Sequence, residues 1–225
     1  MNEKKTKASR LFDEASARLD RGDIRGAIKL YRALAKSGDE LGQHGLAYLL
    51  ADKVKPPRLK EAFYWYKRAV KNGSAMSAWN LALDYAQRGQ SRWQIHWLKV
   101  YAKMDKAGAI EDMTDWAGTL CDRTRAEEAL PYLTLAAKLG NARAQNNLAI
   151  LLETKVQPIR ITEALSWYKK AVRGGSKDAA SNLALHYRDN DNPNAQLRWL
   201  RVAAKMGHPG AKAQIRRLER ALARR

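Results

Sequence analysis

The stretch FYWYKRAVKNGS, at residues 63–74, returns as LSWYKKAVRGGS at residues 165–176. The offset of 102 residues holds along the chain, because residues 27–109 and 129–211 share 37 identities over 83 aligned positions. Agreement of this extent is far above chance. Both halves of the chain therefore descend from one unit, and a repeat architecture is predicted before any single helix is considered.

Each unit of 102 residues divides into three shorter repeats. One large side chain recurs in the middle of each expected second helix, at intervals of 32 or 35 residues: Tyr31, Tyr66, Leu98, Leu133, Tyr168 and Leu200. Within one repeat, Ala62, Trp65 and Tyr66 begin a stripe at helical spacing, and no segment alternates as a strand would. The sequence therefore predicts an all-α solenoid of six helix-pair repeats plus a C-terminal capping helix.

The same pattern sets the expected boundaries of helices and domains. Gly73 is expected to end its helix as a left-handed residue. Helices are expected at 7–20, 24–36, 40–51, 59–71, 75–88, 91–104, 110–122, 125–138, 142–153, 161–173, 177–188, 193–206 and 209–222. We expect a disordered N-terminus at 1–6 and a single helical-repeat domain at 7–225, made of two homologous three-repeat halves at about 7–108 and 109–208 and the capping helix at 209–222.

The composition indicates a basic protein. The chain of 225 residues carries a formal net charge of +19, and the excess lies towards both ends while residues 111–160 are nearly neutral. Such a charge predicts an acidic partner surface. Cys121 is the only cysteine, and the charged opening residues lack the apolar core of a secretory signal. Since no apolar run is long enough to span a membrane, we expect a soluble, cytoplasmic protein.

The residues AQNNLAILLETKVQPIRITEALSWYKKAVRGGSKDA, at 144–179, resemble the Sel1-like repeat family, a relative of the tetratricopeptide repeats. The resemblance covers residues 40–211, and residues 6–39 look more like a tetratricopeptide unit. The chain departs from the family pattern where alanine replaces the glycine of a Leu-Gly pair, as at Ala82 and Ala184, and where a Gly-x-Gly loop is missing. The resemblance implies a right-handed superhelix that binds proteins through its concave face as an adaptor, with no catalytic residues and no cofactor.

In such repeats the first helix of each pair lines the groove, and the resemblance carries this role over to ten residues: His44, Tyr48, Trp79, Asn80, Leu83, Asn146, Asn147, Ile150, Asn182 and Leu185. One interpretation is a groove of amides and apolar anchors that binds an extended or helical peptide. The alternative is that the repeated asparagines only fix the stacking of the repeats. We expect the position shared by His44, Trp79 and Asn146 to be exposed. Because Ser181 stands at its counterpart, Trp79 is a candidate hot spot for binding.

Two sets of basic residues are weighed in the same way. Lys67-Arg68 and Lys169-Lys170 fall in second helices, where the Sel1-like family itself favours lysine, and they are interpreted as a solvated convex face. The C-terminal cluster has more charge than a capping helix requires. It is the candidate contact for an acidic partner and comprises Lys212, Arg216, Arg217, Arg220 and Arg224.

The sequence offers little that points to catalysis. The histidines show no metal-ligand spacing and no nearby cysteine or carboxylate partner: His44, His96, His186 and His208. Cys121 lacks the context of a reactive thiol and is interpreted as a small core residue. No glycine-rich phosphate loop is present. We therefore expect a protein that is not an enzyme and that holds no metal and no cofactor.

These observations favour a bacterial cytoplasmic adaptor that binds an acidic protein or peptide in its concave groove. One version of this hypothesis is an antitoxin or immunity partner that blocks an acidic effector. The alternative is a helical-repeat protein that binds nucleic acid, which would need a continuous basic stripe and exposed stacking aromatics. Contact with an anionic membrane through the C-terminal arginines is a third and weaker option. Neither the identity of the partner nor the oligomeric state is indicated by the sequence.

Overall fold

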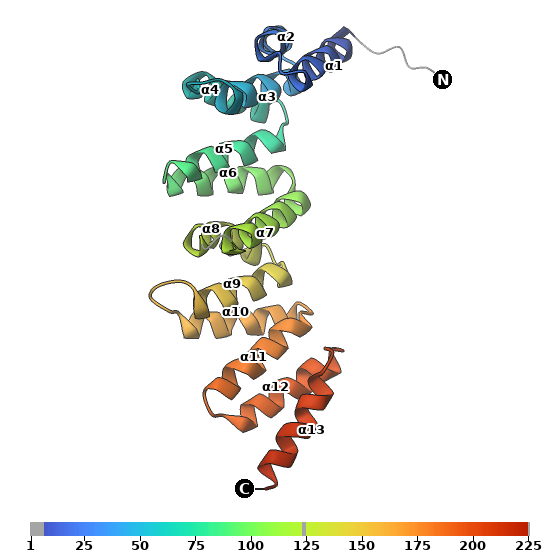
Figure 1. Cartoon of the computed structure of the whole chain (residues 1–225), viewed down its shortest axis with the longest axis vertical. Helices are drawn as coiled ribbons and strands as arrows, with labels where there is room; N and C mark the ends of the chain where they lie inside the picture. The colour runs from blue at the N-terminus through green and yellow to red at the C-terminus, as the bar shows by residue number, and fades with distance from the viewer. Residues whose placement is uncertain (1–6, 123–124, 225) are drawn as a thin grey trace, which may run out of the picture. The chain divides into compact units, whose positions relative to one another are not determined.

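The structure is a computed structural model that describes residues 7–122 and 125–224 (Figure 1). The segment 1–6, which the sequence predicts to be disordered, lies outside these residues. Over the described ranges the regular structure is helical, with thirteen α-helices, one short π-helix and no strand. None of these helices is long and apolar enough to cross a membrane. The chain divides into two compact units, Met1–Lys106 and Ala107–Arg225.

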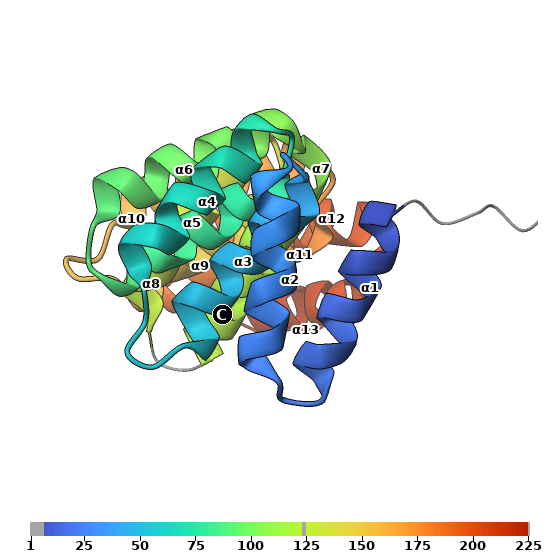
Figure 2. The same cartoon turned by 90° about the horizontal axis from the view of Figure 1, so that it is seen from above.

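The first unit consists of three helix pairs. Each helix packs against the next one in the chain, and α1 and α2 form a hairpin joined by a short turn (Figures 1 and 2). The elements are α1 (Lys7–Asp20), α2 (Ile24–Lys36), α3 (Glu40–Tyr48) with the π-helical turn η1 (Leu49–Lys53), α4 (Leu59–Lys71), α5 (Ala75–Gln87) and α6 (Ser91–Met104).

The second unit has the same order of helices with one more at its end. The elements are α7 (Lys106–Asp122), α8 (Ala126–Lys138), α9 (Ala142–Thr154), α10 (Ile161–Arg173), α11 (Lys177–Asp189), α12 (Pro193–Lys205) and α13 (Ala211–Leu222). Consecutive helices from α8 onward pack against each other. Six helix pairs followed by a last helix confirm the predicted all-α repeat fold. The handedness of the superhelix stays a prediction.

The helices of the two units match at the offset that the sequence shows. α4 and α10 begin and end at equivalent residues, and so do α5 and α11. The loops that lead into α4 and α10 also follow one path. The Arg58 N–H donates to the Leu50 carbonyl at 2.8 Å, and the Arg160 N–H donates to the Leu152 carbonyl at 2.9 Å. The hairpins therefore keep one backbone design while many of their side chains differ.

Alanine and tyrosine build the core of each hairpin. Ala62 and Ala69 in α4 are fully buried, and α10 has buried alanines at the equivalent positions. These small side chains let the helix axes approach closely, and the buried rings of Tyr66 and Tyr168 fill the space beside them. Complete burial of a side chain of this size stabilises the fold by roughly 2 kcal/mol.

Caps fix where the helices begin and end. Asp39 accepts a hydrogen bond from the Gly42 N–H at 2.6 Å at the start of α3, and Asn141 accepts one from the Ala144 N–H at 2.7 Å at the start of α9. A cap of this kind contributes about 1 kcal/mol. Gly73 follows α4 with a φ of 111°, which confirms the predicted left-handed end.

Candidate functional site

The first helices of the second unit carry a ladder of amide side chains. The Asn182 Nδ2 atom on α11 donates to the Asn146 Oδ1 atom on α9 at 2.9 Å. The Asn146 Nδ2 atom in turn donates to the neighbouring Asn147 Oδ1 atom at 3.5 Å, a long and weak contact. One function of these asparagines is therefore to join successive repeats. Asn182 uses only one of its N–H groups within the described ranges, so its remaining amide capacity can serve a ligand.

The first unit uses the equivalent positions differently. The Asn80 Nδ2 atom on α5 donates to the Tyr66 hydroxyl on α4 at 3.3 Å, so it bonds to the second helix of the preceding repeat and not to its first helix. The His44 Nδ1 atom on α3 lies 2.9 Å from the Ser77 Oγ atom on α5 and joins successive repeats in place of an asparagine. Burial lowers the pKa of His44, so that its neutral form is favoured at this contact.

The expected exposure of the position shared by Trp79 and Asn146 is wrong. Trp79 is 9% exposed, and its ring centroid lies 5.8 Å from that of Tyr101 on α6. Asn146 is 8% exposed because it lies between its two amide neighbours. Trp79 is therefore a packing residue. Both residues of this packed pair are replaced together in the second unit, where the residues equivalent to Trp79 and Tyr101 are the small Ser181 and Ala203.

The apolar residues of the predicted groove retain more accessible surface. Leu185 on α11 is 37% exposed, and Tyr48 and Leu83 are partly buried. Asn147 and Ile150 of α9 line a pocket of about 210 Å³ together with residues of α7 and α8. At its edge the Lys155 Nζ atom donates to the Cys121 carbonyl at 3.4 Å. Cys121 thus lines a pocket and is not the fully buried core residue that its sequence context predicts.

A polar network that the sequence did not reveal connects α9, α10 and α11. The Glu153 Oε2 atom accepts a hydrogen bond from the Tyr168 hydroxyl at 2.8 Å, and its Oε1 atom lies 2.6 Å from the His186 Nδ1 atom. Burial, together with the Glu153 carboxylate, raises the pKa of the Tyr168 hydroxyl. The expectation that the histidines lack a carboxylate partner is therefore wrong for His186, and also for His208, whose Nε2 atom lies 3.8 Å from the Asp178 Oδ1 atom. The signal was the separation of 33 residues between Glu153 and His186, which is one repeat length.

In the first unit, the acidic residue stands at the position equivalent to His186 and not at the position equivalent to Glu153. Ala51 replaces the equivalent of Glu153, and Asp84 on α5 replaces the equivalent of His186. Burial raises the pKa of Asp84 to about 6, against the opposing effect of Arg88. Burial also raises the pKa of the Tyr66 hydroxyl, and the charge of Asp84 adds to this effect. Tyr66 thus has Asp84 of α5 near it, whereas Tyr168 has Glu153 of α9.

Four residues of the C-terminal basic cluster lie on α13, which packs against α12, and the fifth, Arg224, follows the end of the helix. The large apolar side chains of the helix are partly buried. The five cluster residues are exposed: Lys212, Arg216, Arg217, Arg220 and Arg224. The Glu219 Oε1 atom, within the same helix, pairs with the Arg201 Nη2 atom of α12 at 3.0 Å. Among the described residues, no group of three or more His, Cys, Asp or Glu side chains is arranged to hold a metal ion.

No family model matches the chain. A stretch of 66 residues is 39% identical to an F-box protein of Arabidopsis thaliana, and it covers 28% of this chain and 18% of that protein. The chain thus spans less than a fifth of that relative's length.

Similar solved structures include a Sel1 repeat protein from Oxalobacter formigenes, with a TM-score of 0.42, 20% identity and coverage of 89% of this chain and 86% of that chain. An immunity protein from Pseudomonas aeruginosa has a TM-score of 0.38, 16% identity and coverage of 93% of this chain and 85% of that chain. Tetratricopeptide repeat proteins are also among them. The helix pairs define the chain as an α-helical repeat protein. Its likenesses are to Sel1-like and tetratricopeptide repeat proteins.

Proposed function

We propose that this chain is a non-enzymatic scaffold that binds another protein along the first helices of its repeats. The observation that supports this most directly is the amide ladder from Asn182 to Asn146, which lies on the first helices of two successive repeats. Free amide groups of such a ladder can pair with the backbone of an extended peptide, and adjacent apolar side chains can hold alternate peptide side chains. Leu185 and Ile150 supply apolar surface on the same two helices.

The partner in this proposal is an acidic protein or peptide. The formal net charge of +19 favours association with a negative surface, and the five exposed cations of the C-terminal cluster provide a local site for it. A more specific version is an antitoxin or immunity role inside a bacterial cell, in which the bound protein would be an acidic effector. The positive charge of the chain is the property that favours an acidic effector as the partner.

Affinity purification with the chain as bait tests the proposal. We expect the same acidic protein to be recovered with and without nuclease treatment, and at moderate salt. The variant Leu185→Asp should lose that protein, because it places a like charge on the apolar part of the proposed binding face.

Ile159→Asp is the matched control. Ile159 is exposed in the loop between α9 and α10 and is not part of a first helix, so this variant should retain the partner. Recovery that disappears with nuclease, with a steep loss of affinity as salt rises, would instead assign the chain to nucleic-acid binding. Equal recovery by Leu185→Asp and the wild type would exclude the first-helix face as the binding surface.

A further inference from the structure

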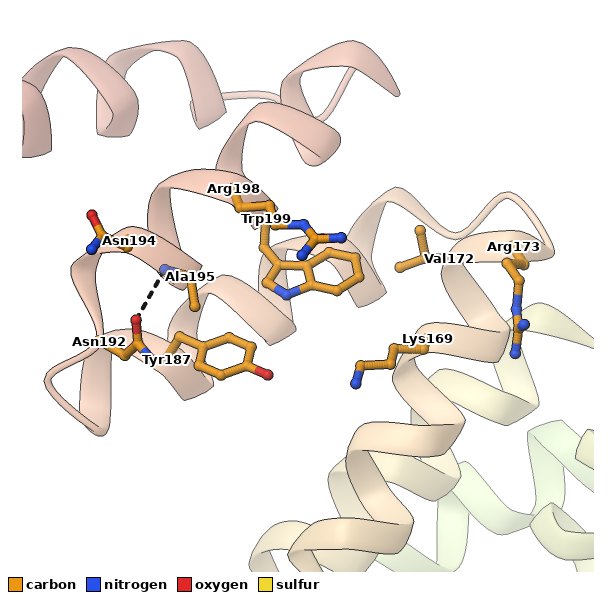
Figure 3. Close-up of a pocket in the computed structure, with 9 residues that line it drawn as sticks. All are labelled: Lys169, Val172, Arg173, Tyr187, Asn192, Asn194, Ala195, Arg198 and Trp199. Carbon is orange, nitrogen blue, oxygen red and sulfur yellow. Dashed lines mark hydrogen bonds between the residues drawn. The ribbon is translucent and has the colours of Figure 1, made fainter.

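A cavity of about 720 Å³ opens on the second helices of the second unit, away from the amide ladder. Its walls come from α10, the C-terminal part of α11 and the beginning of α12 (Figure 3). Two aromatic rings, Tyr187 and Trp199, face this space, and neither is fully buried. Cavities of this size in proteins commonly hold a small ligand or an anchoring side chain.

The first unit shows what the cavity can accept, because there the equivalent place is covered by a side chain of the chain itself. Trp93 is the third residue of α6, and Ala195 is the third residue of α12. The Trp93 ring stacks on Tyr85, with the ring centroids 5.9 Å apart and the ring planes at 26°. Phe63 also contacts Tyr85, with the ring centroids 4.9 Å apart, and Tyr85 is only 9% exposed. At its equivalent, Tyr187, the Trp93 ring has no counterpart, because Ala195 ends at its methyl group.

The cavity also differs from an ordinary apolar pocket in its charge. Lys169, Arg173 and Arg198 line it, and no aspartate or glutamate does. The Arg198 Cζ atom lies 6.0 Å from the centroid of the Trp199 ring. Figure 3 shows the Lys169 ammonium group pointing towards the Tyr187 hydroxyl and Arg173 at the far edge. The three cations are spread around the cavity, which suits several separate carboxylates better than one phosphate group.

We propose that this cavity binds an aromatic side chain of a partner protein that is flanked by acidic residues. The ring stacks on Tyr187 as Trp93 stacks on Tyr85, and the flanking carboxylates pair with Lys169 and Arg198. The inference rests on the proposed function in taking the partner to be an acidic protein. It adds a second contact on the second helices, whose lysines the sequence suggested were only solvated.

Selection from a displayed peptide library tests the inference, with the full chain as target and parallel selections on Ala195→Trp. The wild type should enrich peptides in which Trp, Tyr or Phe stands between Asp or Glu residues. Ala195→Trp should fold normally, because α6 already carries Trp at the equivalent position, and should bind the enriched peptides at least about tenfold more weakly. Replacing the peptide's aromatic residue by alanine should have a similar effect.

A second pair of variants tests the charge. Arg198→Glu should weaken binding of the same peptides by about tenfold or more, whereas Lys205→Glu makes the same charge change on α12 outside the cavity and should have little effect. Because both residues are exposed, neither variant depends on tolerance of the core.

Several results would overturn the inference. One is enrichment of peptides without an aromatic residue. Another is equal peptide binding by the wild type, Ala195→Trp and Arg198→Glu. The third is displacement of the selected peptides by adenosine monophosphate, which would assign the cavity to a nucleotide. Peptides that bind all cavity variants equally but lose affinity for Leu185→Asp would overturn this inference alone, and a library that yields no binder would count against the proposed function as well.

Discussion

His186 and Glu153 lie on the first helices of successive repeats, and the His186 Nδ1 atom is 2.6 Å from the Glu153 Oε1 atom. The same carboxyl group accepts the hydrogen bond of the Tyr168 hydroxyl at 2.8 Å. One acidic side chain therefore connects three helices, α9, α10 and α11. Since a buried polar group is costly when it loses its partner, this network is expected to contribute to stability.

Glu153→Gln should lower the free energy of unfolding by about 1–3 kcal/mol, because the amide cannot replace both charge-assisted contacts of the carboxylate. Urea denaturation followed by circular dichroism measures the change. Glu111→Gln, at an exposed position on α7, makes the same chemical change and should alter stability by less than about 0.5 kcal/mol. Equal stability of the two variants would show that the network contributes nothing.

Asp84 should make the protein less stable as pH rises from about 4 to about 6. Burial raises the pKa of Asp84 in the folded protein from 3.8 to about 6, so the unfolded chain ionises first and is favoured by the rise in pH. The full shift would correspond to about 3 kcal/mol, and partial exposure of the side chain reduces the expected effect to about 1 kcal/mol.

Asp84→Asn removes this dependence, since the amide does not ionise. The difference in unfolding free energy between Asp84→Asn and the wild type should therefore move in favour of the variant between pH 4 and pH 7. Denaturation at both pH values measures it. A difference that stays constant with pH would show that Asp84 ionises as easily in the folded protein as in the unfolded chain.

Trp79→Ser should destabilise the protein by about 3 kcal/mol, because Trp79 packs on Tyr101 and its removal leaves a void. Adding Tyr101→Ala gives the combination that the second unit carries at Ser181 and Ala203. The two losses should not add, and a double-mutant cycle should give a coupling of at least about 0.5 kcal/mol. Strict additivity would mean that the two rings do not stabilise each other.

Charge reversal on α13 should slow association with the acidic partner. Arg216→Glu combined with Arg220→Glu changes exposed charges only, so the association rate should fall by about tenfold with little change in dissociation. Surface plasmon resonance at low and high salt measures both rates. Lys103→Glu, an exposed change on α6, is the control. A loss seen only in the dissociation rate would place these arginines inside a packed interface.

The fold could be predicted closely from the sequence because helical periodicity and repetition encode it directly. The helices at 59–71 and 161–173 have the expected bounds, whereas α7 begins at Lys106, ahead of the expected residue 110. The expected helix at 40–51 changes to a π-helical turn at Leu49–Lys53. The type of each element can thus be predicted from the pattern of apolar residues. The hydrogen bonding that fixes the exact ends of the helices cannot.

The functional surfaces were less predictable, because they depend on which side chains meet across repeats. Comparison with Ser181 alone makes Trp79 a candidate hot spot for binding, whereas its contact with Tyr101 shows that it is a packing residue. Glu153 and His186 are one repeat length apart in the sequence, and only the packing of successive repeats brings their side chains together. The cavity beside Ala195 arises from a missing ring, which a sequence displays only when it is compared with Trp93. The acidic partner and the groove contacts remain predictions.

The helix bounds agree between residues 59–87 and 161–189, so the molecule contains two sibling copies of one helical arrangement that differ in their side chains. A residue tolerated in one sibling is a natural guide to what the other can accommodate. Divergence after duplication could therefore remodel one copy's exterior while the other preserved the inherited framework. Grafting between siblings offers a route to new binding specificities that random mutagenesis of either copy alone would rarely find.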